Sequence, residues 1–209
     1  MLEFRKMRED ELNECAMLAA EAFYSYEYFS TYIAEEKRRE RFLNALIRSE
    51  FKANIRNAEV NFITARKNGK IVAVAQLCMP GFKRPSDMRY LTSGYLGAVW
   101  TGGIRAVSAW LKMDQKASAP CHELPGRNWY LSLFTVAKSD EGTGIGSDFL
   151  QEYLIPYVKA ADGECLSLFT NSKINCRFYE KNGFSIFDEK TFEYEGKTIG
   201  SWSYRMKLN

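Results

Sequence analysis

The amino-acid sequence predicts an α/β fold in which helices flank a mixed, mostly antiparallel central sheet. Three observations support this fold class. Apolar residues recur with helical spacing in the first quarter of the chain, short turns with glycine join two pairs of strand-like segments, and a strand–turn–helix–strand unit occupies residues 129–170. A chain of 209 residues with 46% hydrophobic residues can bury a sizeable core. We therefore expect a single domain over residues 1–209.

The first elements alternate strands with amphipathic helices. We expect a strand at Leu2–Arg5, then a helix at Glu9–Phe23 with its apolar residues on one face. A helix at Glu35–Arg56 is predicted because apolar residues recur every four positions among charged ones, as on a surface helix. Val60–Lys67 and Lys70–Met79 flank an Asn-Gly dipeptide, which predicts a β-hairpin.

Residues 80–128 form an atypical insertion between the third and fourth expected strands. Prolines and a glycine open it as a loop, and Met88–Met113 is apolar and aromatic enough for one or two helices. Its glycines weaken a continuous helix, so we expect a break near Thr101–Gly103. The segment either covers the sheet or helps to form a binding site.

The remaining segments complete the sheet. The expected elements are a strand at Trp129–Val136, a helix at Ile145–Ala160, a strand at Glu164–Thr170, a short helix at Ile174–Asn182, and two strands at Ser185–Tyr194 and Ile199–Leu208 joined by a turn with a glycine.

Three glycines on alternate positions, Gly142, Gly144 and Gly146, precede the helix that follows the strand at 129–136. Such a turn lets successive amides point into one small volume, and the helix N-terminus adds positive potential, so a phosphate or pyrophosphate suits it. The nucleotide P-loop requires a Lys after its last glycine, which is missing here. The dinucleotide fingerprint has another spacing and needs more β-α units after it. A tight turn without a ligand stays open as an alternative.

Two blocks of this sequence resemble the GCN5-related N-acetyltransferase (GNAT) family. Val136–Ser147 is similar to that family's acyl-CoA pyrophosphate loop, and Asn175 precedes Phe178–Phe184, which is similar to its Phe-Tyr-Glu-Lys-x-Gly-Phe signature. The blocks have the order and separation found in the family and cover roughly the last eighty residues. The first half of the chain matches in pattern only.

The resemblance implies a GNAT-like fold with acetyl-CoA as co-substrate. It places the pantetheine arm along the strand at 129–136 and gives Tyr179 the role of general acid toward the thiolate, although Tyr179 can also be a tyrosine at the edge of the core. Asn175 would contact the arm or cap its helix. The residues implied in cofactor binding are Phe134, Thr135, Val136, Glu141, Gly142, Thr143, Gly144, Ile145, Gly146, Ser147, Asn175, Phe178 and Tyr179.

The loop departs from the family pattern at its head. The family usually has Gln or Arg where this chain has Glu141, and often Pro where it has Lys138. A carboxylate repels a pyrophosphate, so either Glu141 points into solvent, with Lys138 offsetting its charge, or the affinity for CoA is weakened.

A primary amine must lose a proton before it attacks, and the base is not evident from the sequence. The strand at 129–136 carries no carboxylate, which leaves His122, its neighbour Glu123, or a chain of water molecules. His122 is the only histidine and can equally be a bystander in a loop. A Cys121–His122 nucleophile pair is disfavoured, because adjacent residues of an extended chain point in opposite directions.

Three classes of function fit these patterns: an N-acetyltransferase acting on a small-molecule amine, a non-catalytic CoA-binding sensor, and a nucleotide-binding domain. The intact Tyr179 favours the enzyme over the sensor, whereas Glu141 keeps the sensor possible; the glycine spacing disfavours the nucleotide domain. Aromatic residues in and just before residues 24–34 either line an acceptor site or pack between helices. They are Phe23, Tyr24, Tyr26, Tyr28, Phe29 and Tyr32.

Composition limits the partners. Five cysteines without Cys-x-x-Cys spacing predict reduced, mostly buried thiols and no metal site. A net charge of +3 with mixed signs gives no reason to expect nucleic acid. Without a long apolar stretch or an apolar leader, we expect a cytoplasmic protein with no membrane partner. Trp202 and Tyr204 either pair subunits in a homodimer or fill the sheet face.

Overall fold

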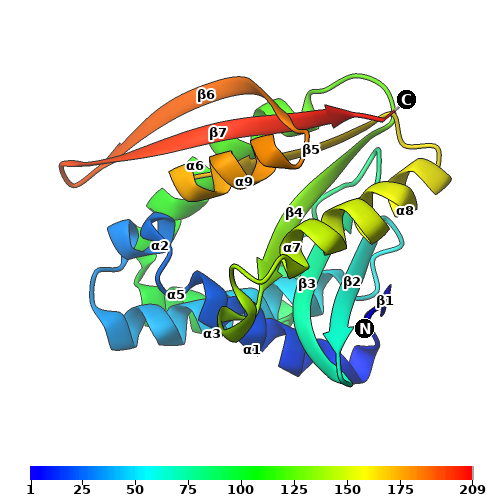
Figure 1. Cartoon of the computed structure of the whole chain (residues 1–209). Coiled ribbons are helices and arrows are strands. Elements are labelled where there is room, and N and C mark those ends of the chain that lie inside the picture. The colour runs from blue at the N-terminus through cyan, green and yellow to red at the C-terminus, as the bar shows by residue number, and fades with distance from the viewer. Residues whose placement is uncertain (209) are drawn as a thin grey trace.

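The computed structural model describes residues 1–208 and contains a seven-stranded sheet in the order β1-β2-β3-β4-β5-β7-β6 (Figure 1). Only β4 and β5 pair in parallel; every other neighbouring pair is antiparallel. The predicted mixed, mostly antiparallel sheet is therefore confirmed. The strands are β1 (Leu2–Lys6), β2 (Val60–Lys67), β3 (Lys70–Cys78), β4 (Asn128–Val136), β5 (Cys165–Thr170), β6 (Ser185–Tyr194) and β7 (Lys197–Lys207).

Helices precede, interrupt and follow the strands. They are η1 (Glu9–Glu11), α1 (Leu12–Phe23), α2 (Glu27–Tyr32), α3 (Glu36–Asn54), α4 (Asp87–Thr92), α5 (Tyr95–Gly102), α6 (Ile104–His122), η2 (Lys138–Asp140), α7 (Ile145–Asp148), the π-helical turn η3 (Phe149–Leu154), α8 (Ile155–Ala160) and α9 (Lys173–Lys181). The helix expected at Ile145–Ala160 is present as α7, η3 and α8 in succession.

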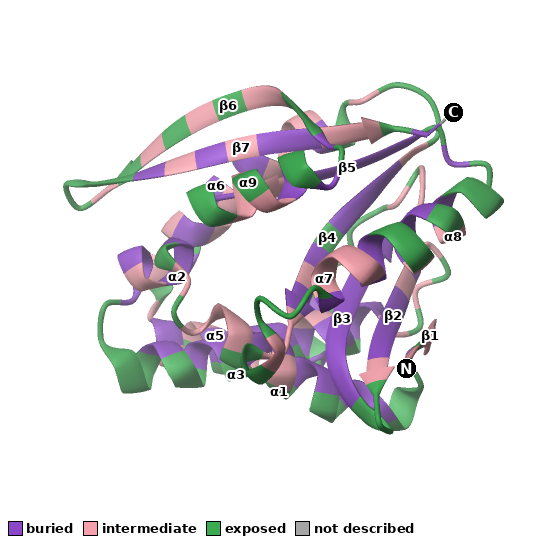
Figure 2. Ribbon diagram, in the orientation of Figure 1, coloured by how far each residue is buried: buried purple, intermediate pink, exposed green. Residues whose placement is uncertain are grey.

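Each face of the sheet has its own apolar cluster. Alternate residues of β3 point to opposite faces, so Val74 belongs to one cluster, whereas Ala73 and Ala75 belong to the other. Helices α1, α3 and α6 cover the first face, and the α7–α8 segment and α9 cover the second. Most residues of β3 and β4 are accordingly buried (Figure 2).

Strands β4 and β5 separate soon after they begin. Their pairing extends only over Asn128–Tyr130 of β4, whereas β4 stays paired with β3 as far as Val136 (Figure 1). The β3–β4 register shifts next to Ser132, whose hydroxyl donates to the carbonyl of Gln76 at 3.2 Å. This bulge adds to the bend of β4. The far half of β4 therefore presents backbone groups toward the space between β4 and β5.

Helix α2 was not predicted. Its residues are largely aromatic or β-branched and have modest helix propensity, so packing must stabilise it. Arg39 of α3 is buried, and its guanidinium donates to the carbonyls of Tyr24, Ile33 and Ala34, on both sides of α2. A charged residue of the predicted surface helix thus holds the segment in place.

The insertion is more helical than predicted. The break near Thr101–Gly103 is confirmed, because Gly103 has a φ of 77° and separates α5 from α6. Helix α6, however, continues nine residues past the expected end at Met113, through Pro120. Pro120 cannot donate to the carbonyl of Lys116, and this carbonyl instead accepts a bond from Lys190 of β6 at 3.2 Å.

Several composition-based expectations can be compared with the structure. All five cysteines are free, and only Cys176 is not buried. Tyr204 is buried, and its hydroxyl donates to Glu180 at 2.7 Å. Of the two alternatives, pairing of subunits or filling the sheet face, the structure shows the second for Tyr204. Within residues 1–208, no cluster of His, Cys, Asp and Glu side chains could hold a metal ion. No helix of that range has the length and apolar character needed to span a membrane.

Candidate active site

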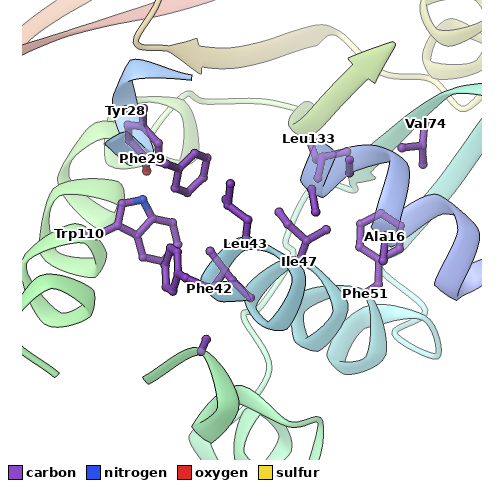
Figure 3. Close-up of a cluster of buried hydrophobic side chains, with 14 of the residues drawn as sticks. Ala16, Tyr28, Phe29, Phe42, Leu43, Ile47, Phe51, Val74, Trp110 and Leu133 are labelled. Atoms are coloured by element: carbon purple, nitrogen blue, oxygen red, sulfur yellow. The ribbon is translucent and has the colours of Figure 1, made fainter. Parts of the chain in front are cut away.

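A cavity of about 560 Å³ lies beside the separated half of β4. Its walls come from β4, the end of β5, and helices α2, α3, α6 and α9, together with the beginning of the 80–128 insertion. The aromatic residues Tyr28, Phe29 and Trp110 gather along one wall, next to α3 (Figure 3). Residues 24–34 and the 80–128 insertion, which the sequence analysis named as candidate walls of a binding site, therefore face the same space as the strand expected to hold CoA.

The glycine loop follows β4 and leads into α7. Gly142 and Gly144 have φ values of 75° and 94°, and a Cβ built on either would meet no atom within 4 Å. The first amides of the helix that begins at Ile145 have no partners within that helix. Open space, free amides and a helix N-terminus fit an anion such as a pyrophosphate.

Glu141 is exposed, which fits the first of the two interpretations of this departure from the family pattern. The neighbouring Asp140 is held by Lys67 at 3.3 Å, and hydrogen bonds from Ser139 and Lys67 lower the pKa of its carboxyl. The Asp140 carboxylate, two residues before the first loop glycine, is therefore directed toward a cation of β2.

Aromatic packing joins the loop to β4 and α9. Phe178 of α9 stacks on Phe134 of β4, with ring centroids 6.0 Å apart and an interplanar angle of 21°. A Cβ added at Gly146 would lie 3.3 Å from Phe178 and 3.5 Å from Val136, so a glycine allows this close approach. Phe178 and Gly146 thus act in positioning the loop. Phe134 also lines the cavity, whereas Thr135 and Val136 continue β4 toward the loop.

Tyr179 and Asn175 both line the cavity from α9. Tyr179 is 7% exposed and packs edge-on against Phe178 and Phe184. Burial raises the pKa of its hydroxyl well above the usual value, so the group keeps its proton at neutral pH and can donate it. Asn175 lies beside the hydroxyl of Tyr26, which also pairs with Thr170 at 2.8 Å.

Glu50 of α3 is a carboxylate in the cavity wall that the sequence analysis did not single out. One oxygen accepts from Asn54 at 2.8 Å and from Gln76 at 3.4 Å, and Gln76 lies on β3 opposite the bulge of β4. Desolvation by burial raises the pKa of the Glu50 carboxyl. A carboxylate with a raised pKa next to the bend in β4 is suited to accept a proton.

Asp114 of α6 is a second unpredicted carboxylate in the wall. The hydroxyl of Tyr28 donates to it at 2.7 Å, and burial raises the pKa of the Asp114 carboxyl. Both carboxylates occupy positions of an apolar stripe: Glu50 follows Leu46 by four residues, and Asp114 follows Trp110 by four. A charged residue within such a stripe was the signal in the sequence for both.

His122 is the last residue of α6 and not a loop residue, and it lines the cavity next to Glu123. Its side chain is exposed on one side, and its ring lies 4.6 Å from that of Tyr130, where β4 and β5 begin to separate. Burial of the other side lowers the pKa of the imidazole. The structure therefore brings His122, Glu123, Tyr179 and Asn175 to one cavity.

Solved structures share this fold. An acetyltransferase from Corynebacterium glutamicum, described as histone acetyltransferase HPA2 and related, matches with 20% identity and a TM-score of 0.63 over 97% of this chain and 94% of its own. An N-acetyltransferase from Staphylococcus aureus Mu50 matches with 15% identity and a TM-score of 0.60 over 100% and 99%. A GCN5-related N-acetyltransferase from Rhodopseudomonas palustris matches with 12% identity and a TM-score of 0.58 over 99% and 95%.

These likenesses confirm the predicted GNAT-like fold over the whole length of the chain, including the half that matched in pattern only. No protein-family model matches the sequence. None of the curated proteins matches it either. The likeness to these proteins is therefore one of fold.

Proposed function

We propose that this protein is an N-acetyltransferase that moves an acetyl group from acetyl-CoA to a primary amine of a small molecule. The fold is that of solved proteins named acetyltransferases. The observation that carries the proposal is the shared cavity. Tyr179 and Glu50 both line it together with β4, and the glycine loop follows the end of that strand.

Acetyl-CoA would supply the acetyl group as a thioester. The amides of Gly142–Ser147 are suited to hold its pyrophosphate, and the β4 backbone at residues 134–136 can pair with the amides of the pantetheine arm. Asn175, which lines the cavity, would donate to that arm. The fit rests on the open space above Gly142 and Gly144 and on the unpaired edge of β4.

The acceptor enters as an ammonium ion, whose pKa is about 10. We assign the removal of its first proton to Glu50, with His122 as the alternative base. The neutral amine then attacks the carbonyl carbon, a C–N bond forms and the C–S bond breaks. Tyr179 gives its proton to the leaving sulfur and regains one from solvent. The nitrogen loses two protons in total: one is balanced by the new thiol and one is released to solvent.

Two measurements on the purified protein test this proposal. The first is calorimetric titration with acetyl-CoA, with NADH and ATP as controls for the alternative nucleotide-binding function. We expect saturable one-to-one binding of acetyl-CoA only. The second is thiol release in the presence of a panel of primary amines, for which Tyr179→Phe should lower kcat by about 10²-fold or more and leave the affinity for acetyl-CoA within about twofold.

The matched control is Tyr204→Phe, which removes a buried hydroxyl from the same apolar cluster. Tyr204 does not line the cavity, and its ring lies 6.2 Å from that of Tyr179. It should leave kcat within a few-fold. Absence of acetyl-CoA binding would contradict the proposal, and binding without turnover of any amine would instead support a CoA-binding sensor. Equal turnover in the Tyr179 variant would remove the assignment of the acid.

A further inference from the structure

One buried carboxylate outside the cavity, Glu11, is fully paired. Its surroundings can be compared with those of the carboxylates in the cavity wall. Glu11 is 5% exposed and accepts bonds from the guanidinium groups of Arg5 and Arg66. The backbone of Arg8 adds a further bond at 3.0 Å. Paired in this way, the Glu11 carboxyl has its pKa lowered to about 2. The fold can therefore neutralise a buried carboxylate where the carboxylate serves structure.

The two cavity carboxylates have no such pairing. Within residues 1–208, neither Glu50 nor Asp114 has an ion-pair partner within 4.0 Å. Their hydrogen-bond donors are neutral groups: Asn54, Gln76 and the hydroxyl of Tyr90 for Glu50, and the hydroxyl of Tyr28 for Asp114. Both side chains are half-buried, and a charge withdrawn from water without a counter-ion beside it is costly, so both sites are suited to a cation from outside.

The other charged groups at the cavity do not neutralise the negative charge of Glu50 and Asp114. Arg84 and Glu123 also line it, and His122 has a lowered pKa and is neutral at pH 7. Arg84 is exposed, and its guanidinium lies over the ring of Tyr90, 5.0 Å from the centroid. Its charge lowers the pKa of both carboxyls, but desolvation by burial is the larger effect and raises both. One guanidinium therefore stands against three carboxylates around the cavity. The excess of negative charge favours a ligand with more than one positive charge.

Two buried polar atoms in the same wall also lack partners. The indole nitrogen of Trp110, a residue only 8% exposed, and the hydroxyl of Tyr95 form no hydrogen bond with any described residue. Both residues line the cavity. The Tyr95 hydroxyl can accept a bond from an ammonium group, and the aromatic rings of Trp110 and Tyr28, which line the same cavity, can stabilise a cation. These groups point to a ligand that reaches the α5–α6 side of the cavity.

We propose that the acceptor is a diamine: its reacting amino group is bound at Glu50, and a second, permanently protonated amino group is bound at Asp114 among Tyr28, Tyr95 and Trp110. This inference rests on the proposed acetyl transfer and names the substrate class of that site. An apolar spacer between the two groups suits the aromatic walls.

The chemistry requires the second cation. The reacting nitrogen gives up its charge before it attacks, so it cannot neutralise Asp114 during the reaction. A second ammonium keeps its charge throughout and can form a charge-assisted bond with Asp114. An amino acid would instead bring its own carboxylate close to Glu50 or Asp114, which like charges disfavour. A monoamine would leave one of the two carboxylates without a counter-ion.

The test compares α,ω-diamines from 1,3-diaminopropane to 1,8-diaminooctane with n-alkylamines and ω-amino acids of the same chain lengths, as acceptors and as calorimetric ligands. For the best diamine, we expect kcat/KM at least about tenfold above the matched monoamine. Asp114→Asn keeps an acceptor for Tyr28 and removes the charge; it should raise KM for the diamine roughly 10- to 100-fold with little change in kcat. It should not raise KM for the monoamine, which has no second ammonium group to bind at Asp114.

Two variants make the result specific to the charge at residue 114. Asp114→Glu should recover much of the diamine preference, which a purely structural role would not predict. Asp162→Asn makes the same change at an exposed turn residue with a φ of 54°, where Asn is tolerated, and should behave as wild type. Thermal unfolding of each variant confirms that it is folded.

The two proposals fail in different ways. If acetyl-CoA binds and amines turn over, but diamines show no advantage or Asp114→Asn leaves their KM unchanged, the diamine inference is overturned and acetyl transfer stands. If no amine is acetylated, while diamines bind in calorimetry and Asp114→Asn abolishes that binding, the diamine site stands and acetyl transfer does not.

Discussion

Glu11 and Glu50 are both carboxylates withdrawn from solvent, yet their surroundings shift their pKa values in opposite directions. Two guanidinium groups and a backbone amide lower the pKa of Glu11, whereas desolvation with only neutral donors raises that of Glu50. The first arrangement stabilises a charge permanently. The second favours a group that gains and loses a proton during turnover, as a general base must.

The assignment of Glu50 as the general base is tested by comparing the pH dependence of kcat/KM between wild type and Glu50→Gln. A base is active when deprotonated, so wild-type kcat/KM should rise with pH through an apparent pKa above that of an ordinary glutamate, because burial raises the pKa of Glu50. Removing the carboxylate should lower kcat/KM at neutral pH by about 10²- to 10⁴-fold and abolish that rise. The measurement is a pH profile of kcat/KM at saturating acetyl-CoA.

His122→Gln is the matched comparison, because His122 lines the same cavity at its rim. If Glu50 is the base, this variant should keep the wild-type profile within about threefold. The opposite pattern, in which loss of the imidazole removes the rise and loss of the Glu50 carboxyl does not, would transfer the role to His122. Affinity for acetyl-CoA should stay unchanged in both variants.

At the scale of elements, the glycine loop and the start of α7 act as one unit. Gly144→Glu should weaken acetyl-CoA binding at least about 100-fold, because the new side chain would fill the open space above the loop with a like charge. Calorimetric titration measures the loss. The φ of 94° at Gly144 adds backbone strain of about 1–2 kcal/mol.

Gly196→Glu separates this effect from strain. Gly196 has a φ of 76° and equally open surroundings, but it lies in the turn between β6 and β7. The strain should be similar and acetyl-CoA affinity should stay within about twofold of wild type. Equal affinity losses in the two variants would mean that the loop is not the anion site.

The elements that could be predicted are those set by local signals. The Asn-Gly turn fixed the β2–β3 hairpin, and Gly103 ended α5 where expected. Helix α2 could not be predicted, because it is stabilised by Arg39, which lies outside the helix in the sequence. The full length of α6 could not be predicted either. Pro120 leaves one helix carbonyl without a donor, and Lys190, in a distant strand, donates to that carbonyl. Such long-range compensation has no local signature.

The candidate site also has one part that local sequence signals predict and one part that only the fold shows. The cofactor half, with Gly142–Ser147, Asn175 and Tyr179, is a pair of contiguous blocks whose resemblance to a family is visible in the sequence. The acceptor half brings Glu50 and Asp114 together from α3 and α6, about sixty residues apart, and only the fold shows that they share a wall. A charged residue inside an apolar stripe is the one local indication of each.

Across the whole molecule, the two apolar clusters stabilise the two faces of one sheet, and the cavity lies where that sheet divides. The edge at β1 is stabilised in another way. Glu11 precedes α1 and joins Arg5 of β1 to Arg66 of β2, so a single carboxylate holds the first strand, the second strand and the first helix together. Global stability should therefore depend on the ionisation of Glu11.

Glu11→Gln tests that dependence. The folded-state pKa of Glu11 is about 2, against 4.5 for the unperturbed group, so its contribution to the free energy of unfolding is complete above about pH 4.5 and is lost as the pH falls toward 2. At pH 7 the variant should be destabilised by about 2–3 kcal/mol, the lower part of that range reflecting the partial exposure of the two arginines. Urea unfolding should show a constant difference between wild type and variant from pH 7 to about pH 5, and a difference that shrinks from there toward pH 3. Glu9→Gln, which breaks the exposed pair with Arg56, should change the free energy of unfolding little at any of these pH values. A wild-type advantage over Glu11→Gln that stays constant down to pH 3 would mean that the side chain acts through packing and not through its charge.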